Sequence, residues 1–243
     1  MFKVIIVDNY EEISKEAFNV MKEFLKPNAV LGLATGSSPV GLYQEMIKDH
    51  KENGTSYAEI KTFNLDEYAN LPKDHQESYY TFMHRNLFDH IDIKEENVHV
   101  PNGNGDLEAN CKEYDEMIDK SPVDIQLLGI GANGHIGFNE PGTSFESLTH
   151  VTDLTEQTRK DNARFFDPLN EEVPTQACTM GLKTIMKAKK VLLVANGENK
   201  AKAIKGLLEG EVTEDLPASI LQKHHDVVVI IDKAAGKLLE KNY

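Results

Sequence analysis

Short apolar runs recur along the chain, separated by stretches of mixed polarity. Each run has six or seven residues, and most are rich in valine, isoleucine and leucine. Most lack the polar alternation of a half-exposed strand, so they are typical of strands buried on both faces of a parallel sheet. We predict long strands at residues 2–7, 29–34, 60–65, 123–129, 190–195 and 226–231, and a short one at 98–100.

The stretches between these runs predict helices. Ile13, Ala17, Met21 and Phe24, for example, share one face at helical spacing. We expect helices between Asn9 and Pro27, from Pro39 through about residue 50, at 78–90, 107–118, 155–166, 181–188 and 198–208, and after the last strand to the C-terminus.

This alternation of strands and helices predicts an α/β protein with three layers. An open, mostly parallel sheet would carry helices on both faces. No repeat or linker-like change of composition divides the chain, so we expect a single domain over residues 1–243. Residues 142–174 lack a buried-strand pattern, and we expect this segment to form a lid over a site.

Composition narrows the class of protein. About 40% of the 243 residues are hydrophobic, which suffices for a sizeable core. No apolar run approaches the roughly 18–20 residues of a membrane span, and no secretory signal is evident, so a soluble cytoplasmic protein is expected. The net charge of −14 argues against nucleic acid or an anionic membrane as a partner. Cys111 and Cys178 lack metal-ligand spacing, so we expect reduced thiols and no metal.

Polar stretches follow four of the predicted strands directly. Ligands of open parallel sheets bind beyond the carboxyl ends of the strands. If the sheet is parallel, all four stretches lie at one edge and form one site. They are Thr35-Gly36-Ser37-Ser38, Asp66-Glu67, residues 131–140 and residues 196–200.

The first stretch has the features of an anion-binding turn. Gly36 permits close approach of the backbone to a ligand, and Pro39 suits the first position of the following helix. Free N–H groups at that helix start, with the hydroxyls of Thr35, Ser37 and Ser38, would bind an anion. No Walker motif follows, and an ordinary capped turn is the alternative.

Two further stretches contain candidate acids and bases. Asp66 and Glu67 end an apolar strand, where partial burial would raise the pKa of a carboxyl toward that of a useful base, although a helix cap or surface acid is an alternative. His135 lies in a glycine-rich loop and suits proton transfer near neutral pH, with Glu140 available to orient it. The alternative for His135 is a structural hydrogen bond to the backbone.

A few arginines and one lysine are candidates for binding an anion. The chain has only three arginines, and Arg159 and Arg164 lie in one segment. Lys200 lies in the first turn of a predicted helix, where the helix dipole disfavours a cation unless an anion is nearby. A solvated helix face would also explain the arginines. Together these cations indicate a substrate that carries phosphate.

The segments TGSSPVGLY, FNLDEY, GIGANGHIGFNEPG, TRKDNARFF and NGENKAKAI are similar, in order and spacing, to motifs of the glucosamine-6-phosphate deaminases. The resemblance covers essentially the whole chain. It implies a single α/β domain of modified Rossmann type that uses no metal or organic cofactor. The implied reaction converts glucosamine 6-phosphate and water to fructose 6-phosphate and ammonia, in amino sugar catabolism.

The resemblance also implies a role for each site residue. Asp66 would move a proton between C2 and C1 through an enolamine. His135 would open the sugar ring by proton transfer, and Glu140 would hold it, with Asn133 in the same group. The phosphate would be bound by Thr35, Gly36, Ser37, Ser38, Arg164 and Lys200.

One segment departs from the allosteric, hexameric members of the family. Those members carry a basic R-x-K-T run where this chain has His150, Val151, Thr152 and Asp153. The cations that would hold a phosphorylated-sugar activator are missing. We therefore expect no activator site, and a monomer or small homo-oligomer.

Two other functions are alternatives. A 6-phosphogluconolactonase shares the fold and a related glycine-rich segment, but typically continues it toward S-L-F-P where this chain has residues 137–140 as G-F-N-E. A non-catalytic sugar-phosphate sensor need not retain Asp66, His135 and Glu140 together. Such a sensor usually also carries a DNA-binding helix-turn-helix, and residues 1–243 include no basic N-terminal extension of that kind.

Overall fold

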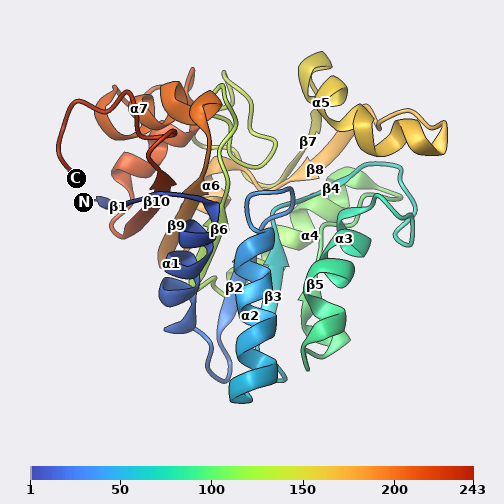
Figure 1. Ribbon diagram of the computed structural model, residues 1–243. Coiled ribbons are helices and arrows are strands. Elements are labelled where there is room, and N and C mark those ends of the chain that lie inside the picture. The colour runs from blue at the N-terminus through green and yellow to red at the C-terminus, as the bar shows by residue number, and fades with distance from the viewer. Residues whose placement is uncertain (1) are drawn as a thin grey trace.

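A seven-stranded sheet forms the centre of the protein, and every strand pairing in it is parallel (Figure 1). The structure is a computed structural model that describes residues 2–243. All seven predicted strands are present in it. In spatial order they are β1 (Phe2–Val7), β10 (Val227–Asp232), β9 (Lys190–Ala195), β6 (Ile125–Leu128), β2 (Val30–Leu33), β3 (Lys61–Asn64) and β5 (Val98–His99).

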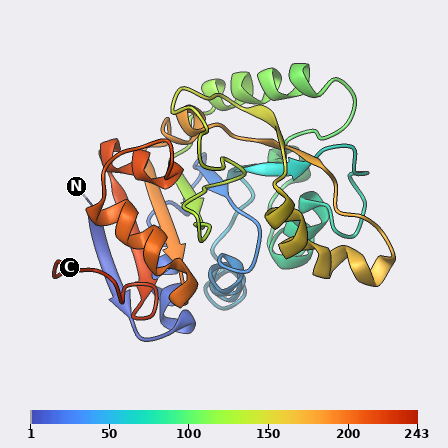
Figure 2. The same cartoon turned by 90° about the horizontal axis from the view of Figure 1, so that it is seen from above.

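Helices cover both faces of this sheet, as the alternating pattern predicted. Figure 2 shows α2 on one side and α4 on the other. The first helix illustrates the cause: the Asn9 side chain accepts the Glu12 N–H at its start, and Ile13, Ala17 and Met21 are buried. The helices are α1 (Tyr10–Lys22), α2 (Val40–Asn53), α3 (Tyr79–Asn86), α4 (Leu107–Lys120), α5 (Glu156–Phe166), α6 (Leu182–Ile185) and α7 (Ala201–Glu209).

A second, smaller sheet was not predicted. Its three antiparallel strands are β4 (Asp66–Tyr68), β8 (Gln176–Thr179) and β7 (His150–Asp153). The apolar run at 60–65 therefore does not continue into 66–68 as one strand, because the chain changes sheets at Leu65. These strands are too short, and β7 is too exposed, for a buried-strand pattern to reveal them.

Two predicted helices need correction. The chain after β10 forms turns rather than a closing helix, because Gly236 interrupts it and Leu238 and Leu239 are adjacent instead of at helical spacing. The helix expected at 78–90 ends at Asn86, where Leu87 leaves helical geometry (φ −147°), and a 3₁₀ turn at Phe88–His90 follows.

The segment expected as a lid consists of β7, α5 and connecting loops. Its residues Leu154, Phe166 and Val173 pack with Tyr68 and Phe138 in a small apolar cluster. The small sheet connects this segment to the main sheet through β4, which follows β3 (Figure 1). Within residues 2–243, none of the helices has the length and apolar content of a membrane-spanning segment.

Candidate active site

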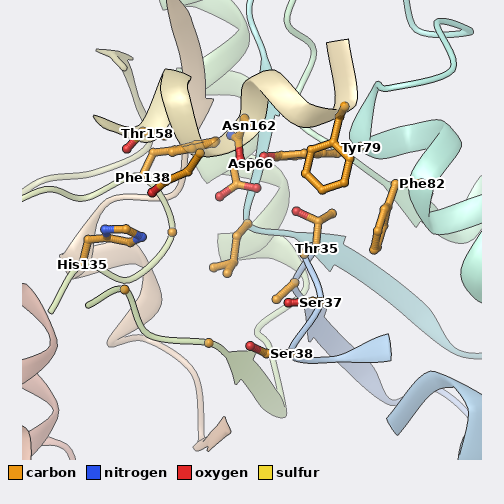
Figure 3. A pocket seen from close by; sticks show the side chains of 18 of the residues that line it. Thr35, Ser37, Ser38, Asp66, Tyr79, Phe82, His135, Phe138, Thr158 and Asn162 are labelled. Carbon is orange, nitrogen blue, oxygen red and sulfur yellow. The ribbon is translucent and has the colours of Figure 1, made fainter. Parts of the chain in front are cut away.

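A cavity of about 570 Å³ lies beyond the carboxyl ends of β2, β6 and β9 and beside the small sheet (Figure 3). The polar stretches that follow the strands meet here, which confirms the predicted convergence at one edge. Eight of the ten predicted site residues line the cavity: Thr35, Gly36, Ser37, Ser38, Asp66, His135, Arg164 and Lys200. The other two, Asn133 and Glu140, contact His135 or each other without lining the cavity.

Tyr10 of α1 fixes the loop from Thr35 to Ser38 by hydrogen bonds. Gly36 has a φ of +87°, a conformation that favours glycine. The Tyr10 hydroxyl contacts the carbonyl oxygens of Ser37 and Ser38 at 2.8 and 3.0 Å, and it accepts the Gly41 N–H. Pro39 precedes α2 rather than occupying its first position, and no side chain among residues 2–243 caps this helix. The helix start is therefore suited to an anion.

Asp66 lies near the middle of the cavity, on β4 (Figure 3). Its pairing with Thr179 of β8 fixes the strand, and only 6% of the residue is exposed. Burial, with the charge of Glu67 as a second cause, raises the pKa of Asp66 to about 8. A carboxyl with such a pKa can act as a base near neutral pH.

Aromatic side chains form the wall beside Asp66. Tyr79 and Phe82 of α3 lie on one side of it and Phe138 on the other, as Figure 3 shows. Asn162 of α5 lies above it and donates to the Tyr68 hydroxyl at 2.9 Å. None of these was among the predicted site residues. Phe138, inside the glycine-rich motif, and Asn162, inside the TRKDNARFF motif, had a signal in the sequence, whereas Tyr79 and Phe82 had none.

An amide connects His135 to Glu140. The Asn133 Nδ2 group donates to Glu140 Oε2 at 2.7 Å, and Asn133 Oδ1 lies 2.8 Å from His135 Nδ1. The His135 Nδ1–Glu140 Oε2 distance is 3.6 Å, an ion-pair contact longer than a hydrogen bond. Asn133, which was expected in the same group as His135 and Glu140, thus lies between the two.

This chain of hydrogen bonds assigns the tautomer of His135. A carboxylate only accepts, so the Asn133 amide must present its NH₂ to Glu140 and its oxygen to His135. That oxygen also accepts the backbone N–H of His135. The proton of a neutral imidazole consequently lies on Nδ1, and Nε2 is left free to exchange a proton with a ligand.

Glu140 remains ionised to unusually low pH. Burial alone would raise the pKa of Glu140, but contacts with His135, Asn133 and Thr158 outweigh it and bring the value to about 2. Thr158, on α5, donates to Glu140 Oε1 at 2.9 Å. Helix α5 therefore ends a hydrogen-bonded chain that runs from Thr158 through Glu140 and Asn133 to His135.

The cations divide into two groups. Arg164 and Lys200 line the cavity, and burial lowers the pKa of Lys200 while the charge of Asp161 partly opposes this. Arg85 of α3 also lines it, which the sequence did not reveal. Arg159 instead lies 3.9 Å from Glu172, outside the cavity lining. Within residues 2–243, no group of three or more His, Cys, Asp or Glu side chains is arranged to hold a metal.

A parallel sheet with an anion-binding loop, a buried base and a histidine group at its carboxyl edge defines an α/β protein built to act on a small phosphorylated ligand. A family model described as glucosamine-6-phosphate isomerases/6-phosphogluconolactonase matches residues 8–230, and the chain belongs to this family.

The chain is 54% identical over 241 residues to a glucosamine-6-phosphate deaminase of Thermoanaerobacter sp. (strain X514), covering 98% of this chain and 95% of the relative. A solved monomeric glucosamine-6-phosphate deaminase matches with a TM-score of 0.94 at 49% identity, covering 98% of this chain and all of that one. A 6-phosphogluconolactonase from Leishmania guyanensis, at a TM-score of 0.77 and 21% identity over 99% of this chain and all of that one, shares the fold.

Proposed function

We propose that this protein is a glucosamine-6-phosphate deaminase that converts glucosamine 6-phosphate and water to fructose 6-phosphate and ammonia. One observation carries the assignment of roles: Asp66 and His135 line the same cavity from different elements. His135, Asn133 and Glu140 are joined by hydrogen bonds and together form the His135 group. An isomerisation that starts from a closed sugar ring needs two such groups, one at the ring oxygen and one at C2. The 54% identity to a named deaminase supports the same reaction.

Ring opening is the task of the His135 group. His135 Nε2 is free to take the proton of the C1 hydroxyl and to return a proton to the ring oxygen. The imidazolium formed in between lies close to the Glu140 carboxylate, 3.6 Å away at Nδ1, and this ion-pair contact stabilises it. Asn133 keeps the imidazole in the required tautomer.

Proton transfer at C2 is the task of Asp66. As a base, its carboxylate takes the proton from C2 of the open sugar, and the substrate's own ammonium group gives a proton to the C1 oxygen, so that an enolamine forms. The same carboxyl then returns its proton to C1, which leaves an iminium at C2. Water adds to this carbon, and ammonia leaves as the C2 carbonyl forms. The buried position of Asp66 supports this role, because it keeps the carboxyl basic.

The phosphate is bound at the opposite end of the sugar. The turn of Thr35, Gly36, Ser37 and Ser38 offers hydroxyls and N–H groups, and Arg164 and Lys200 supply positive charge. These local groups act against the net charge of −14. The proposed substrate is a small molecule, and we propose no nucleic acid or membrane as a partner. We also propose that the protein is located in the cytoplasm.

The assay that tests this function incubates the protein with glucosamine 6-phosphate and measures fructose 6-phosphate and ammonia together. Equal amounts of the two products are expected. A parallel incubation with 6-phosphogluconolactone tests the second activity found in the family. Lactone hydrolysis without ammonia release would replace the deaminase assignment with that of a lactonase, and binding without either reaction would indicate a sensor.

A further inference from the structure

Glu67 follows Asp66 on β4 but lies on the other side of the strand, away from the cavity lining. Only 4% of it is exposed. Its carboxylate accepts three backbone N–H groups, from Tyr68, Tyr79 and Tyr80, each at 2.9 Å. The last two belong to the first turn of α3, where the helix dipole favours a negative charge.

The groups around Glu67 stabilise its negative charge but do not cancel it with a positive one. Burial raises the pKa of the Glu67 carboxyl, and the three N–H donors oppose this rise. His75 is close enough to interact with Glu67, but it pairs with Glu171 at 2.7 Å. The N–H donors stabilise a carboxylate by charge-assisted hydrogen bonds, yet they leave its net charge at −1. A fixed negative charge thus lies one residue away from Asp66.

We propose that Glu67 is a positioning residue for the reaction, whose fixed charge behind β4 keeps Asp66 basic enough to take the proton from C2. The inference rests on the proposed role of Asp66 as that base. It assigns Glu67 no contact with the substrate.

The other groups that face Asp66 cannot supply this charge. Tyr68 of β4, Tyr79 of α3 and Tyr114 of α4 all interact with it, and burial raises the pKa of each phenol above its usual range. These hydroxyls are neutral at the pH of the reaction. After burial itself, the charge of Glu67 is the remaining cause of the raised pKa of Asp66.

The two hydrogen bonds from Tyr79 and Tyr80 attach α3 to β4, so a purely structural role must be separated from the electrostatic one. Glu67→Gln is suited to this, because glutamine has the same shape and its oxygen still accepts the N–H groups of Tyr68 and Tyr79, while the charge and the hydrogen bond from Tyr80 are lost. The measurement is the pH profile of kcat/KM. We expect the acid limb to move to lower pH by about one pH unit, and the plateau to fall because Asp66 becomes a weaker base.

Two variants serve as controls. Glu67→Asp retains the charge, so its acid limb should stay near that of the wild type even if the protein is less stable. Asp106→Asn removes a carboxylate that caps α4, where it accepts the Ala109 N–H at 3.1 Å, and should leave the profile unmoved. If Glu67→Gln lowers the rate at every pH without moving the acid limb, the role is structural and the proposal is overturned.

A measurement on the wild type covers the case in which Glu67→Gln does not fold. The ¹³C signal of the Asp66 carboxyl, assigned by its absence from Asp66→Asn, should titrate well above that of Glu67. Titration of Asp66 at the usual carboxyl pH would overturn the proposal. Full turnover by Asp66→Asn would instead refute Asp66 as the base, so the two failures are distinguishable.

Discussion

At the scale of single residues, the side-chain amide of Asn133 determines how the imidazole of His135 is oriented. Asn133 is fixed by Glu140, and the orientation of its amide then selects the imidazole tautomer. The residue types of this group were evident in the glycine-rich motif. Their order of contact was not, because it depends on the path of the loop rather than on spacing along the chain.

Asp66→Asn should abolish turnover while leaving substrate binding largely intact. Asparagine has nearly the same volume but cannot take a proton from C2. A loss of at least 10²-fold in kcat is expected, in line with the usual contribution of a general base. Binding of fructose 6-phosphate, measured by calorimetry, is the control. Unchanged turnover would exclude Asp66 as the base.

The acid limb of kcat/KM should report the ionisation of Asp66. Burial disfavours the charged form, so the pKa of Asp66 lies near 8 and the basic form accumulates only as the pH rises through that value. The rate should therefore increase from pH 6 to above pH 8, after the substrate's own titration is divided out. A profile that is flat over this range would show that Asp66 is already ionised.

Gly131→Ala should displace the imidazole. A Cβ at this position would lie 2.3 Å from ring atoms of His135, so the ring must rotate away from Asn133. A fall in kcat of about 10²-fold is expected if ring opening depends on His135. Gly129→Ala, whose Cβ would meet Ser38 at an ordinary 3.7 Å, should lose less activity. Equal losses in the two variants would contradict the role of this contact.

At the scale of elements, the strands of the main sheet followed from the sequence and the small sheet did not. Runs such as residues 190–195 are apolar throughout because both faces are buried. The three strands of the small sheet have three or four residues each, and the pairing of β4 with β8 joins segments more than 100 residues apart, which no local pattern records. The candidate site was predicted best where glycine and polar residues follow a long strand.

The aromatic wall was missed for a related reason. Tyr79 and Phe82 reach the cavity because α3 begins at Tyr79, whose N–H binds Glu67. In the sequence they are ordinary helix residues, and only the contact between α3 and β4 places them next to Asp66. Arg85 lies one helical turn after Phe82 on α3 and therefore lines the cavity as well.

Helix α5 is connected to the catalytic group by one hydroxyl, so Thr158→Val tests that connection. Valine keeps the shape of the side chain but leaves Glu140 Oε1 without its donor from α5. A fall in kcat of about tenfold is expected, since one such hydrogen bond contributes roughly 1–2 kcal/mol. Thr158→Ser retains the hydroxyl and should recover most of the rate. Equal rates for the Thr158→Val and Thr158→Ser variants would show that α5 does not act through Glu140.

At the scale of the whole molecule, we propose that the protein is a monomer or small homo-oligomer without an activator site. β7 carries His150, Thr152 and Asp153 and no lysine or arginine, so it offers no permanent cation to a phosphorylated sugar. The solved relative at 49% identity is described as monomeric.

Rate curves should accordingly be hyperbolic and unaffected by N-acetylglucosamine 6-phosphate at concentrations that do not compete with the substrate. Sedimentation at the assay concentration gives the oligomeric state in parallel. A sigmoidal curve that the acetylated sugar phosphate makes hyperbolic would refute the absence of an activator site.

The position of β10 has a consequence for how the chain is made. β10 is the last strand in the sequence, yet it lies inside the sheet, between β1 and β9. During synthesis β1 leaves the ribosome first and has no neighbour until residues 227–232 emerge. Until then its edge stays open to other nascent chains. The interval before residues 227–232 emerge is therefore when this protein is most dependent on chaperones, and premature termination before Val227 would leave β1 permanently unpaired.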